Sequence, residues 1–182
     1  MKRYGLFQIF GELRIFLCNY FIAYLPSHHI RLFYYKNVMH FKIDKGSSIH
    51  LGCKFSCTKN FSLGINSTVN QNCYLDNRGG IHIQNHVSIA HRVAIVTADH
   101  DVTSKQFKGR ERPVFIEDYA FIGFGATILG GVTISLGSIV GTCSLVTKTT
   151  KPYSLNYGIP SVLKGTRVKE LQYENSYKRL FH

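Results

Sequence analysis

The segment 116–146 reads IEDYAFIGFGATILGGVTISLGSIVGTCSLV, and an aliphatic residue returns in it at every sixth position. The same spacing is found in the sequence from residue 63 onward. The aliphatic positions are Leu63, Val69, Leu75, Ile83, Ile89, Ile95, Ile116, Ile122, Ile128, Ile134, Val140 and Val146. A small or β-branched residue follows most of them at a distance of four, as at Ala120 and Ala126. Neither an α-helix nor an alternating strand repeats every six residues, so this pattern predicts a parallel β-helix.

Each group of six residues would form one short flat face that ends in a corner, with its aliphatic side chain pointing inward. Three faces would make one coil, and each inward side chain would stack on its equivalent in the next coil. A small residue directly after the aliphatic one, as at Gly64, Ala90, Gly123 and Gly141, suits a corner where backbones approach closely. The expected fold class is therefore an all-β solenoid.

Four runs in this solenoid resemble the hexapeptide-repeat acetyltransferases, a family with a left-handed parallel β-helix. The runs are 68–76 (TVNQNCYLD), 81–90 (IHIQNHVSIA), 97–100 (TADH) and 139–148 (IVGTCSLVTK). Within the family the chain is most similar to sugar O-acetyltransferases of the galactoside and maltose type and to their relatives in surface-polysaccharide synthesis. The left hand is implied by this resemblance alone, because parallel crossovers in general are right-handed.

The expected organisation has three parts: amphipathic helices in 1–40, the β-helix in 41–165 with an excursion loop at 97–113, and a helical tail in 166–182. In the first part, apolar residues recur every three or four positions, which predicts a helix that ends before Pro26. These residues are Leu6, Ile9, Phe10, Leu13, Leu17, Phe21 and Tyr24. Polar residues such as Glu12 and Arg14 interrupt the segment, so it does not read as a clean membrane span.

The predicted amino-terminal helices have three open roles. They can cap the open end of the solenoid, pack against another subunit, or rest on an anionic membrane through their aromatic and basic residues. A second short helix, expected over 30–38, carries Arg31 and Lys36 beside several aromatic residues. These roles are compatible with one another.

The charge of the chain restricts its partners. Lys and Arg number 22 against 10 Asp and Glu, which gives a formal charge of +12 and favours anionic partners. The basic residues are spread along the chain without a nucleic-acid-binding motif, so nucleic acid is not an expected partner. A coenzyme that bears several phosphates fits this balance.

The five cysteines show no paired zinc spacing, and Cys57 and Cys73 fall in the registers expected to be buried. Free thiols and the absence of a cleavable signal site favour the cytoplasm, with peripheral contact at the inner face of the membrane as an open alternative.

The repeat stops after Ile95 and resumes near Ile116, and the segment between is polar. Loops this long inside a compact fold are usually functional. In the resembling family this excursion reaches a neighbouring subunit and carries the catalytic histidine, which matches His100. The resemblance thus implies a homotrimeric, acetyl-CoA-dependent O-acetyltransferase that acts on a sugar hydroxyl, with His100 as general base, in O-antigen, capsule or exopolysaccharide biosynthesis.

The resemblance also implies the remaining site residues. Asn70 and Asp76 match the family's contacts to the acceptor, which is expected to be a sugar or a lipid-linked saccharide. Six positions would bind acetyl-CoA: Gly123, Gly141 and Thr142 along the pantetheine arm, and Thr147, Lys148 and Lys164 at the nucleotide end. Phe124 stands where the family often has a small residue, which would narrow the donor groove. No metal is expected.

Two other classes of protein stay open at this point. Trimeric left-handed solenoids include zinc carbonic anhydrases, and His82, His86 and His91 lie close together in the sequence. Three imidazoles and a water would make a catalytic zinc centre. The runs 97–100 and 146–148 have no role in such an enzyme. The second alternative is a non-catalytic solenoid scaffold.

Overall fold

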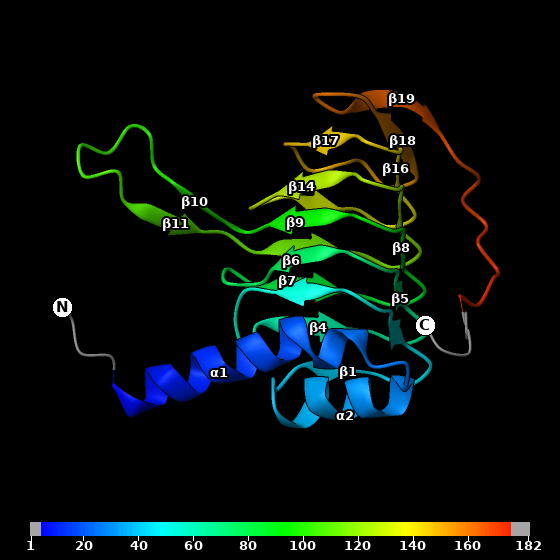
Figure 1. The fold of residues 1–182 in the computed structure, drawn as a ribbon. Coiled ribbons are helices and arrows are strands. Elements are labelled where there is room, and N and C mark those ends of the chain that lie inside the picture. Colours follow the sequence, from blue (N-terminus) through cyan, green and yellow to red (C-terminus); the bar gives the residue numbers. More distant parts are fainter. Residues whose placement is uncertain (1–4, 176–182) are drawn as a thin grey trace.

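The structure of the protein is a computed structural model that describes residues 5–175. It is a parallel β-helix with helices at its base and one hairpin that projects from its side (Figure 1). The helices are α1 (Leu6–Tyr20), the 3-10 helix η1 (Ile22–Tyr24) and α2 (His28–Asn37).

Three parallel sheets form the walls of the solenoid. The first contains β1 (Lys42–Ile43), β4 (Phe61–Leu63), β7 (Ile81–Ile83), β12 (Val114–Ile116) and β15 (Thr133–Ile134). The second contains β2 (Ser48–Ile49), β5 (Thr68–Val69), β8 (Ser88–Ile89), β13 (Phe121–Ile122), β16 (Ile139–Val140) and β18 (Ser154–Tyr157), with the antiparallel β19 (Val162–Thr166) at its end. The third contains β3 (Lys54–Phe55), β6 (Tyr74–Asp76), β9 (Ala94–Val96), β14 (Thr127–Leu129) and β17 (Leu145–Val146).

Three edges join these sheets. The first–second edge includes residues 64–67, 84–87, 117–120 and 135–138, and the second–third edge includes 70–73, 90–93, 123–126 and 141–144. The third–first edge includes 77–80, 97–113 and 130–132. Because each sheet stacks equivalent residues of successive coils, an edge is a column of corners rather than one loop.

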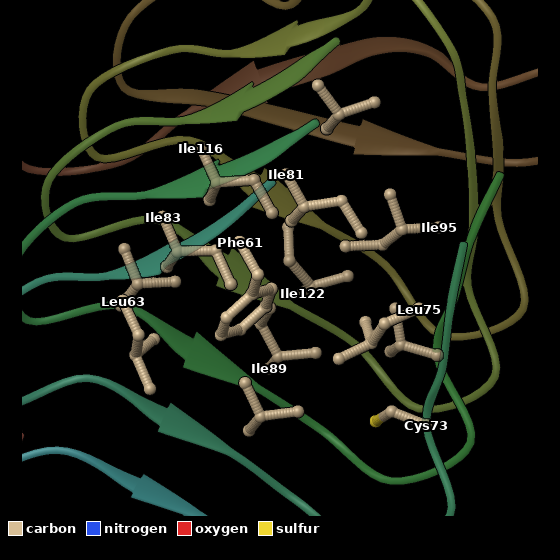
Figure 2. Close-up of a cluster of buried hydrophobic side chains, with 14 of the residues drawn as sticks. Phe61, Leu63, Cys73, Leu75, Ile81, Ile83, Ile89, Ile95, Ile116 and Ile122 are labelled. Carbon is tan, nitrogen blue, oxygen red and sulfur yellow. The ribbon is translucent and has the colours of Figure 1, made fainter. Parts of the chain in front are cut away.

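The predicted inward positions form the core. Ile83 pairs with Leu63 below and Ile116 above, and Ile122 pairs with Ile89 and Val140. Figure 2 shows the side chains of Leu63, Ile83, Ile89, Ile116 and Ile122 converging from different strands on the centre of the solenoid. All twelve repeat positions are buried, none with more than 3% of its surface exposed. Since burial of one such side chain stabilises by roughly 1.5–3 kcal/mol, the stacked column supplies most of the driving force for folding.

The expected register of the first coils is partly wrong. Ile43 pairs with Leu63, and Leu63 with Ile83, so each early coil is twenty residues long rather than eighteen. The two extra residues of these coils lie at the corners 57–60 and 77–80. The carboxamide of Asn77 bonds to the backbone of this lower corner, so Cys57 lies partly exposed at a corner instead of facing inward.

In these first coils Leu51 is partly exposed at a corner, whereas Ile49, Phe55 and Phe61 are buried. Cys73 is buried as expected.

The carboxy-terminal tail is not helical through residue 175. β18 and β19 form an antiparallel hairpin at the upper end, and 167–175 then run back along the first–second edge. Arg167 donates to the carbonyl oxygen of Tyr119 at 3.3 Å, and Asn175 Nδ2 donates to that of Val87 at 2.9 Å. Pairing with β19 covers the last strand of the second sheet, which would otherwise be an open edge. The remainder of the expected tail, 176–182, lies outside the described residues, as do 1–4.

The amino-terminal helices cover the lower end of the solenoid. The side chain of Asn19 on α1 donates to the carbonyl oxygen of Phe55 at 2.8 Å and accepts from its N–H at 2.9 Å. The buried Arg31 of α2 donates to the carbonyl oxygen of Ile49 at 3.3 Å. A solenoid needs such a cover because its terminal coil has no neighbour to bury its core.

Candidate active site

The excursion predicted at 97–113 contains a regular hairpin. Strands β10 (Ala98–His100) and β11 (Gly109–Glu111) pair antiparallel, with His100 opposite Gly109. The hairpin leaves the solenoid at the third–first edge and projects well beyond it (Figure 1). The sequence therefore located the excursion but not its strand pairing.

Two glycines and one hydrogen bond fix the base of this hairpin. The N–H of Arg112 donates to the carbonyl oxygen of Thr97 at 2.8 Å. A Cβ atom on Gly79 would lie 2.7 Å from the nitrogen of Arg112, and one on Gly130 would lie 3.0 Å from the carbonyl oxygen of Thr97. Glycine is needed on both sides because the backbones of three coils meet there.

Asp76 belongs to the same base. Its side chain is 1% exposed and accepts from Nε of Arg78 at 2.8 Å and from Nη2 at 2.9 Å. Its Oδ2 also accepts from the N–H of Ala98 at 3.2 Å, at the start of β10. Burial alone would raise the pKa of this carboxyl, but the hydrogen bonds and charge of Arg78 outweigh it and lower the pKa. Asp76 therefore binds the hairpin, with both carboxylate oxygens engaged inside the chain.

His100 is exposed on β10 and stacks on Phe107. The ring centroids are 4.5 Å apart and the planes are within 2° of parallel. The carboxylate of Asp99 instead binds Arg110 and Arg112, both at 2.8 Å. The hydrogen bond from Arg110 lowers the pKa of Asp99.

Asp101, on the other side of His100 in the sequence, accepts from the hydroxyl of Thr103 at 2.7 Å, and this hydrogen bond lowers its pKa. Both carboxylates that flank His100 in the sequence are thus bound to other residues of the hairpin, because alternate side chains of a strand point to opposite faces.

The predicted site residues divide between two edges of the solenoid. Asp76, His100, Thr147 and Lys148 lie on the third–first edge or directly after the third-sheet strand β17, whereas Asn70, Gly123, Gly141 and Thr142 lie on the second–third edge. Lys164 is exposed on β19. The two groups stand at opposite ends of the third sheet, so one chain does not bring them together.

On the second–third edge the two glycines have a structural reason of their own. A Cβ on Gly123 would lie 2.6 Å from the nitrogen of Thr142, and one on Gly141 would overlap the ring of Tyr157. Their N–H groups already donate to carbonyl oxygens of the next coil at 2.8 Å. Phe124, Thr142 and Cys143 are the exposed residues of these corners.

Asn70, lower on the same edge, donates from Nδ2 to the carbonyl oxygen of Ile89 at 2.8 Å. This hydrogen bond fixes the orientation of the Asn70 amide group and therefore also the direction of its side-chain oxygen. The residue is partly exposed at its corner.

Three residues at the hairpin were not predicted: Arg78, Thr97 and Phe107. Phe107 could have been noticed as an aromatic residue within an otherwise polar excursion. Arg78 carries no sequence signal, because its pairing with Asp76 depends on the way that the corner turns. Thr97 begins the run 97–100, but its structural role could not be predicted because its hydroxyl bonds to residues of another coil.

The histidines considered for zinc lie apart. His82, on the first sheet, stacks on Phe115 at 5.1 Å, while His86, on the first–second edge, stacks on Tyr119 at 4.9 Å. His91 lies on the second–third edge. Within residues 5–175 no group of three His, Cys, Asp or Glu side chains is arranged to hold a metal ion.

The hydrogen bonds that Asp76 accepts from Arg78 and Ala98, called here the Asp76 brace, predict that acid destabilises the hairpin. Because its pKa is lowered in the folded protein, the Asp76 carboxylate stabilises the hairpin fully above its usual pKa of about 3.9, and this contribution is lost as the pH falls through the lower folded value. At neutral pH, Asp76→Ala should lower the free energy needed to open the hairpin by about 1–3 kcal/mol, because the Arg78 guanidinium and the N–H of Ala98 lose their acceptor. Hydrogen exchange of the peptide 96–113, corrected for intrinsic rates, measures both.

Asp99→Ala is the matched control, because its ion pairs with Arg110 and Arg112 are exposed and such pairs contribute little. Equal exchange in the Asp76 and Asp99 variants would show that the brace does not hold the hairpin.

Comparison with known proteins agrees with this fold. No protein-family model matches the chain. A galactoside O-acetyltransferase from Lactococcus lactis is 33% identical over 109 residues, which are 58% of this chain and 53% of that protein. The chain spans about half the length of the curated relatives it matches.

Two solved structures illustrate the likeness in three dimensions. A hexapeptide-repeat acetyltransferase from Vibrio cholerae, solved with acetyl coenzyme A, has a TM-score of 0.80 at 21% identity and covers 88% of this chain and 89% of its own. A maltose O-acetyltransferase from Clostridium difficile has a TM-score of 0.75 at 23% identity, with 87% and 84% covered. In its left-handed β-helix fold the chain is thus similar to the hexapeptide-repeat acetyltransferases, and its sequence relatives are named as acetyltransferases, so the predicted resemblance is confirmed.

Proposed function

We propose that the protein is an acetyl-CoA-dependent O-acetyltransferase that acetylates a sugar hydroxyl. The observation that carries this proposal is an exposed histidine on a hairpin whose base is fixed by Thr97, Asp76 and two glycines, with the ring stacked on Phe107. Such an imidazole keeps its position without burial and stays accessible to a substrate. The names of the relatives support the reaction type.

In this mechanism His100 is the general base. A ring nitrogen accepts the proton of the acceptor hydroxyl while the oxygen attacks the thioester carbonyl. The new C–O bond forms, the C–S bond breaks, and the proton returns from the imidazolium to the sulfur of coenzyme A. Transfer is direct, so no group of the protein is acylated, and the rate depends on holding both substrates in line.

The donor would lie along the second–third edge, beside the exposed Thr142 and the corner glycines Gly123 and Gly141, the second of which packs against the ring of Tyr157. Arg92 lies 5.8 Å from the Phe124 ring at this edge, which restrains the aromatic side chain. Thr147, Lys148 and Lys164 are exposed near the upper end and would contact the phosphates of the nucleotide.

The acceptor would approach His100 from the third–first edge, with Asn70 as a hydrogen-bonding partner. Because both oxygens of Asp76 are engaged by Arg78 and Ala98, we assign it the positioning of the hairpin rather than a direct sugar contact. A role in surface-polysaccharide synthesis at the cytoplasmic side of the membrane fits an acceptor that is a lipid-linked saccharide.

Release of free coenzyme A thiol by the purified full-length chain tests the reaction. Acetyl-CoA would be supplied with simple galactosides and glucosides, sugar nucleotides and lipid-linked saccharides in parallel. We expect thiol release that depends on the acceptor and a product that is heavier by one acetyl group. Thiol release independent of every acceptor, or none at all from folded protein, would contradict the proposal.

The division of the site between two edges predicts a homotrimer in which one copy supplies His100 and its neighbour supplies the second–third edge. Light scattering should give about three times the chain mass of 20.7 kDa. Mixed trimers of His100→Ala and Asn70→Ala chains, each inactive alone, should recover about one quarter of wild-type activity, since one interface in four joins two intact halves. A fully active monomer would rule this arrangement out.

A further inference from the structure

Helix α1 has two distinct sides. Ile15, Cys18 and Asn19 face the first coil and are buried or half-buried. The opposite side carries an apolar stripe at helical spacing, each member 37–58% exposed: Ile9, Phe10, Leu13, Phe16, Leu17 and Tyr20. Figure 1 shows α1 running along the base of the solenoid, with its first turns projecting beyond it. The amphipathic face predicted from the sequence therefore points outward, and capping does not use it.

Other large apolar residues extend this outward stripe. Phe16 contacts both Tyr20 and Phe21, with ring centroids 5.0 and 5.9 Å apart, so the aromatic residues form a cluster at the end of the helix. Tyr24 follows, 53% exposed, and Ile30 and Phe33 of α2 are 51% and 66% exposed. An exposed apolar stripe that ends in an aromatic cluster usually marks an interaction site, because contact of a large apolar patch with water is unfavourable.

Positive charge accompanies the stripe. Between residues 5 and 60 the accessible charged residues are six basic ones and two acidic ones: Arg14, Lys36, Lys42, Lys45, Lys54 and Lys59 against Glu12 and Asp44. The ammonium group of Lys54 lies 5.2 Å from the centre of the Tyr20 ring, at the border of the stripe. Aromatic and aliphatic side chains bordered by cations are complementary to a bilayer surface with anionic headgroups.

By length and composition, Leu6–Tyr24 is a helix that could cross a membrane. The contacts of its carboxy-terminal half favour another arrangement. α1 itself has 15 residues, about 22 Å long, against a hydrocarbon core of about 30 Å. The helix ends at Tyr20, with Phe21 as its C-cap, and the side-chain oxygen and nitrogen of Asn19 both hydrogen-bond to the backbone of Phe55. If α1 crossed the membrane, its carboxy-terminal end would have to leave the coil that it covers.

We propose that the base of the solenoid docks on an anionic membrane, with α1 lying in the interface and its outward stripe among the lipid headgroups and first methylenes. This proposal does not depend on acetyl transfer. It has a consequence for the substrate, because β9, which leads to His100, lies two strand spacings above β3. At about 4.8 Å per strand and about 10 Å for the helix layer, the hairpin base would stand roughly 20 Å above the lipid. A saccharide attached to a lipid could span that distance.

Vesicle co-sedimentation of the full-length chain tests the docking. Vesicles of phosphatidylcholine with phosphatidylglycerol should bind the protein, and pure phosphatidylcholine should bind it at least about tenfold more weakly. Raising salt from about 0.1 M to about 1 M should release much of the bound protein. The variant Phe10→Ser/Leu13→Ser/Phe16→Ser should lose about tenfold or more in affinity, because it removes apolar area from the stripe.

The double variant Phe115→Ser/Phe121→Ser, which removes exposed aromatic residues from the upper coils, is the matched control and should bind as wild type. Binding that survives the triple substitution, or failure of the wild-type chain to bind anionic vesicles, would overturn the proposal. So would a triple variant that changes the oligomeric mass in light scattering, because the stripe would then be covered by a second copy.

A second measurement does not depend on the triple variant folding. The chain contains no tryptophan, so Phe16→Trp introduces a single reporter in the stripe. Its emission should shift to shorter wavelength with anionic vesicles, and lipids brominated near the headgroup should quench it more than lipids brominated near the chain end. Stronger quenching from the chain end would indicate a spanning helix and overturn the interfacial arrangement. Phe121→Trp should show no shift.

Discussion

His100→Ala should lower turnover by about two to four orders of magnitude, the usual contribution of a positioned general base. Neither neighbouring carboxylate can replace it, because Asp99 is bound by two arginines and Asp101 by Thr103. Affinity for acetyl-CoA should hardly change, since the proposed donor groove lies on a different edge of the solenoid. Turnover, donor affinity and melting temperature would be measured on the same preparation.

His29→Ala is the control for this experiment, because His29 is exposed on α2 at the base and far along the fold from the hairpin. It should keep wild-type turnover. If His100 only fixed the hairpin by stacking on Phe107, its removal would lower the melting temperature and leave most of the activity. Near-wild-type turnover of folded His100→Ala would end the assignment.

Ile122→Ala should lower the free energy of unfolding by about 2–5 kcal/mol. Ile122 is fully buried in β13, and its strand stands between Ile89 below and Val140 above. Truncation of Ile122 leaves a cavity inside the solenoid. The hydrogen bonds between neighbouring coils fix their spacing, so the surrounding core has little freedom to close that cavity. Each coil depends on its neighbours, and the loss should therefore reach the whole solenoid.

Ile122→Val, which removes one methylene, should cost about 0.5–1.5 kcal/mol, and the outward-facing Thr133→Ala about 0.5 kcal/mol or less. Guanidinium unfolding at one fixed protein concentration measures these values, because subunit dissociation would make stability depend on concentration. Losses of the same size for Ile122→Ala and Thr133→Ala would contradict the stacking model.

The repeat itself was readable because it is a local rule applied many times. An aliphatic residue every six positions can satisfy only one kind of stacked coil, and twelve such residues in register leave little freedom for another fold. The excursion could be located for the same reason, since a long polar interruption in a solenoid must leave it. His100 followed from its match to the family's run at the start of that excursion.

The amino-terminal helix shows where periodicity stops being informative. Spacing predicted an apolar face from Leu6 to Tyr24, but spacing does not say which side of a helix meets the core. Ile15 and Cys18 pack against the core of the first coils, and the side chain of Asn19 is held there by the backbone of Phe55. The larger residues are left facing outward, as only the packed structure could decide.

The arrangement of the residues in the candidate site depended most on the tertiary structure. The sequence by itself determined the coil, its corners and the excursion that carries His100, because these follow from residue type and spacing. The pairing of His100 with Phe107, the capture of Asp76 by Arg78 and Ala98, and the separation of Asn70 from His100 across the third sheet are contacts between segments that the chain brings together only on folding. Such contacts depend on the length of each corner, and two extra residues at 57–60 were enough to move Cys57 from an expected core position to a corner.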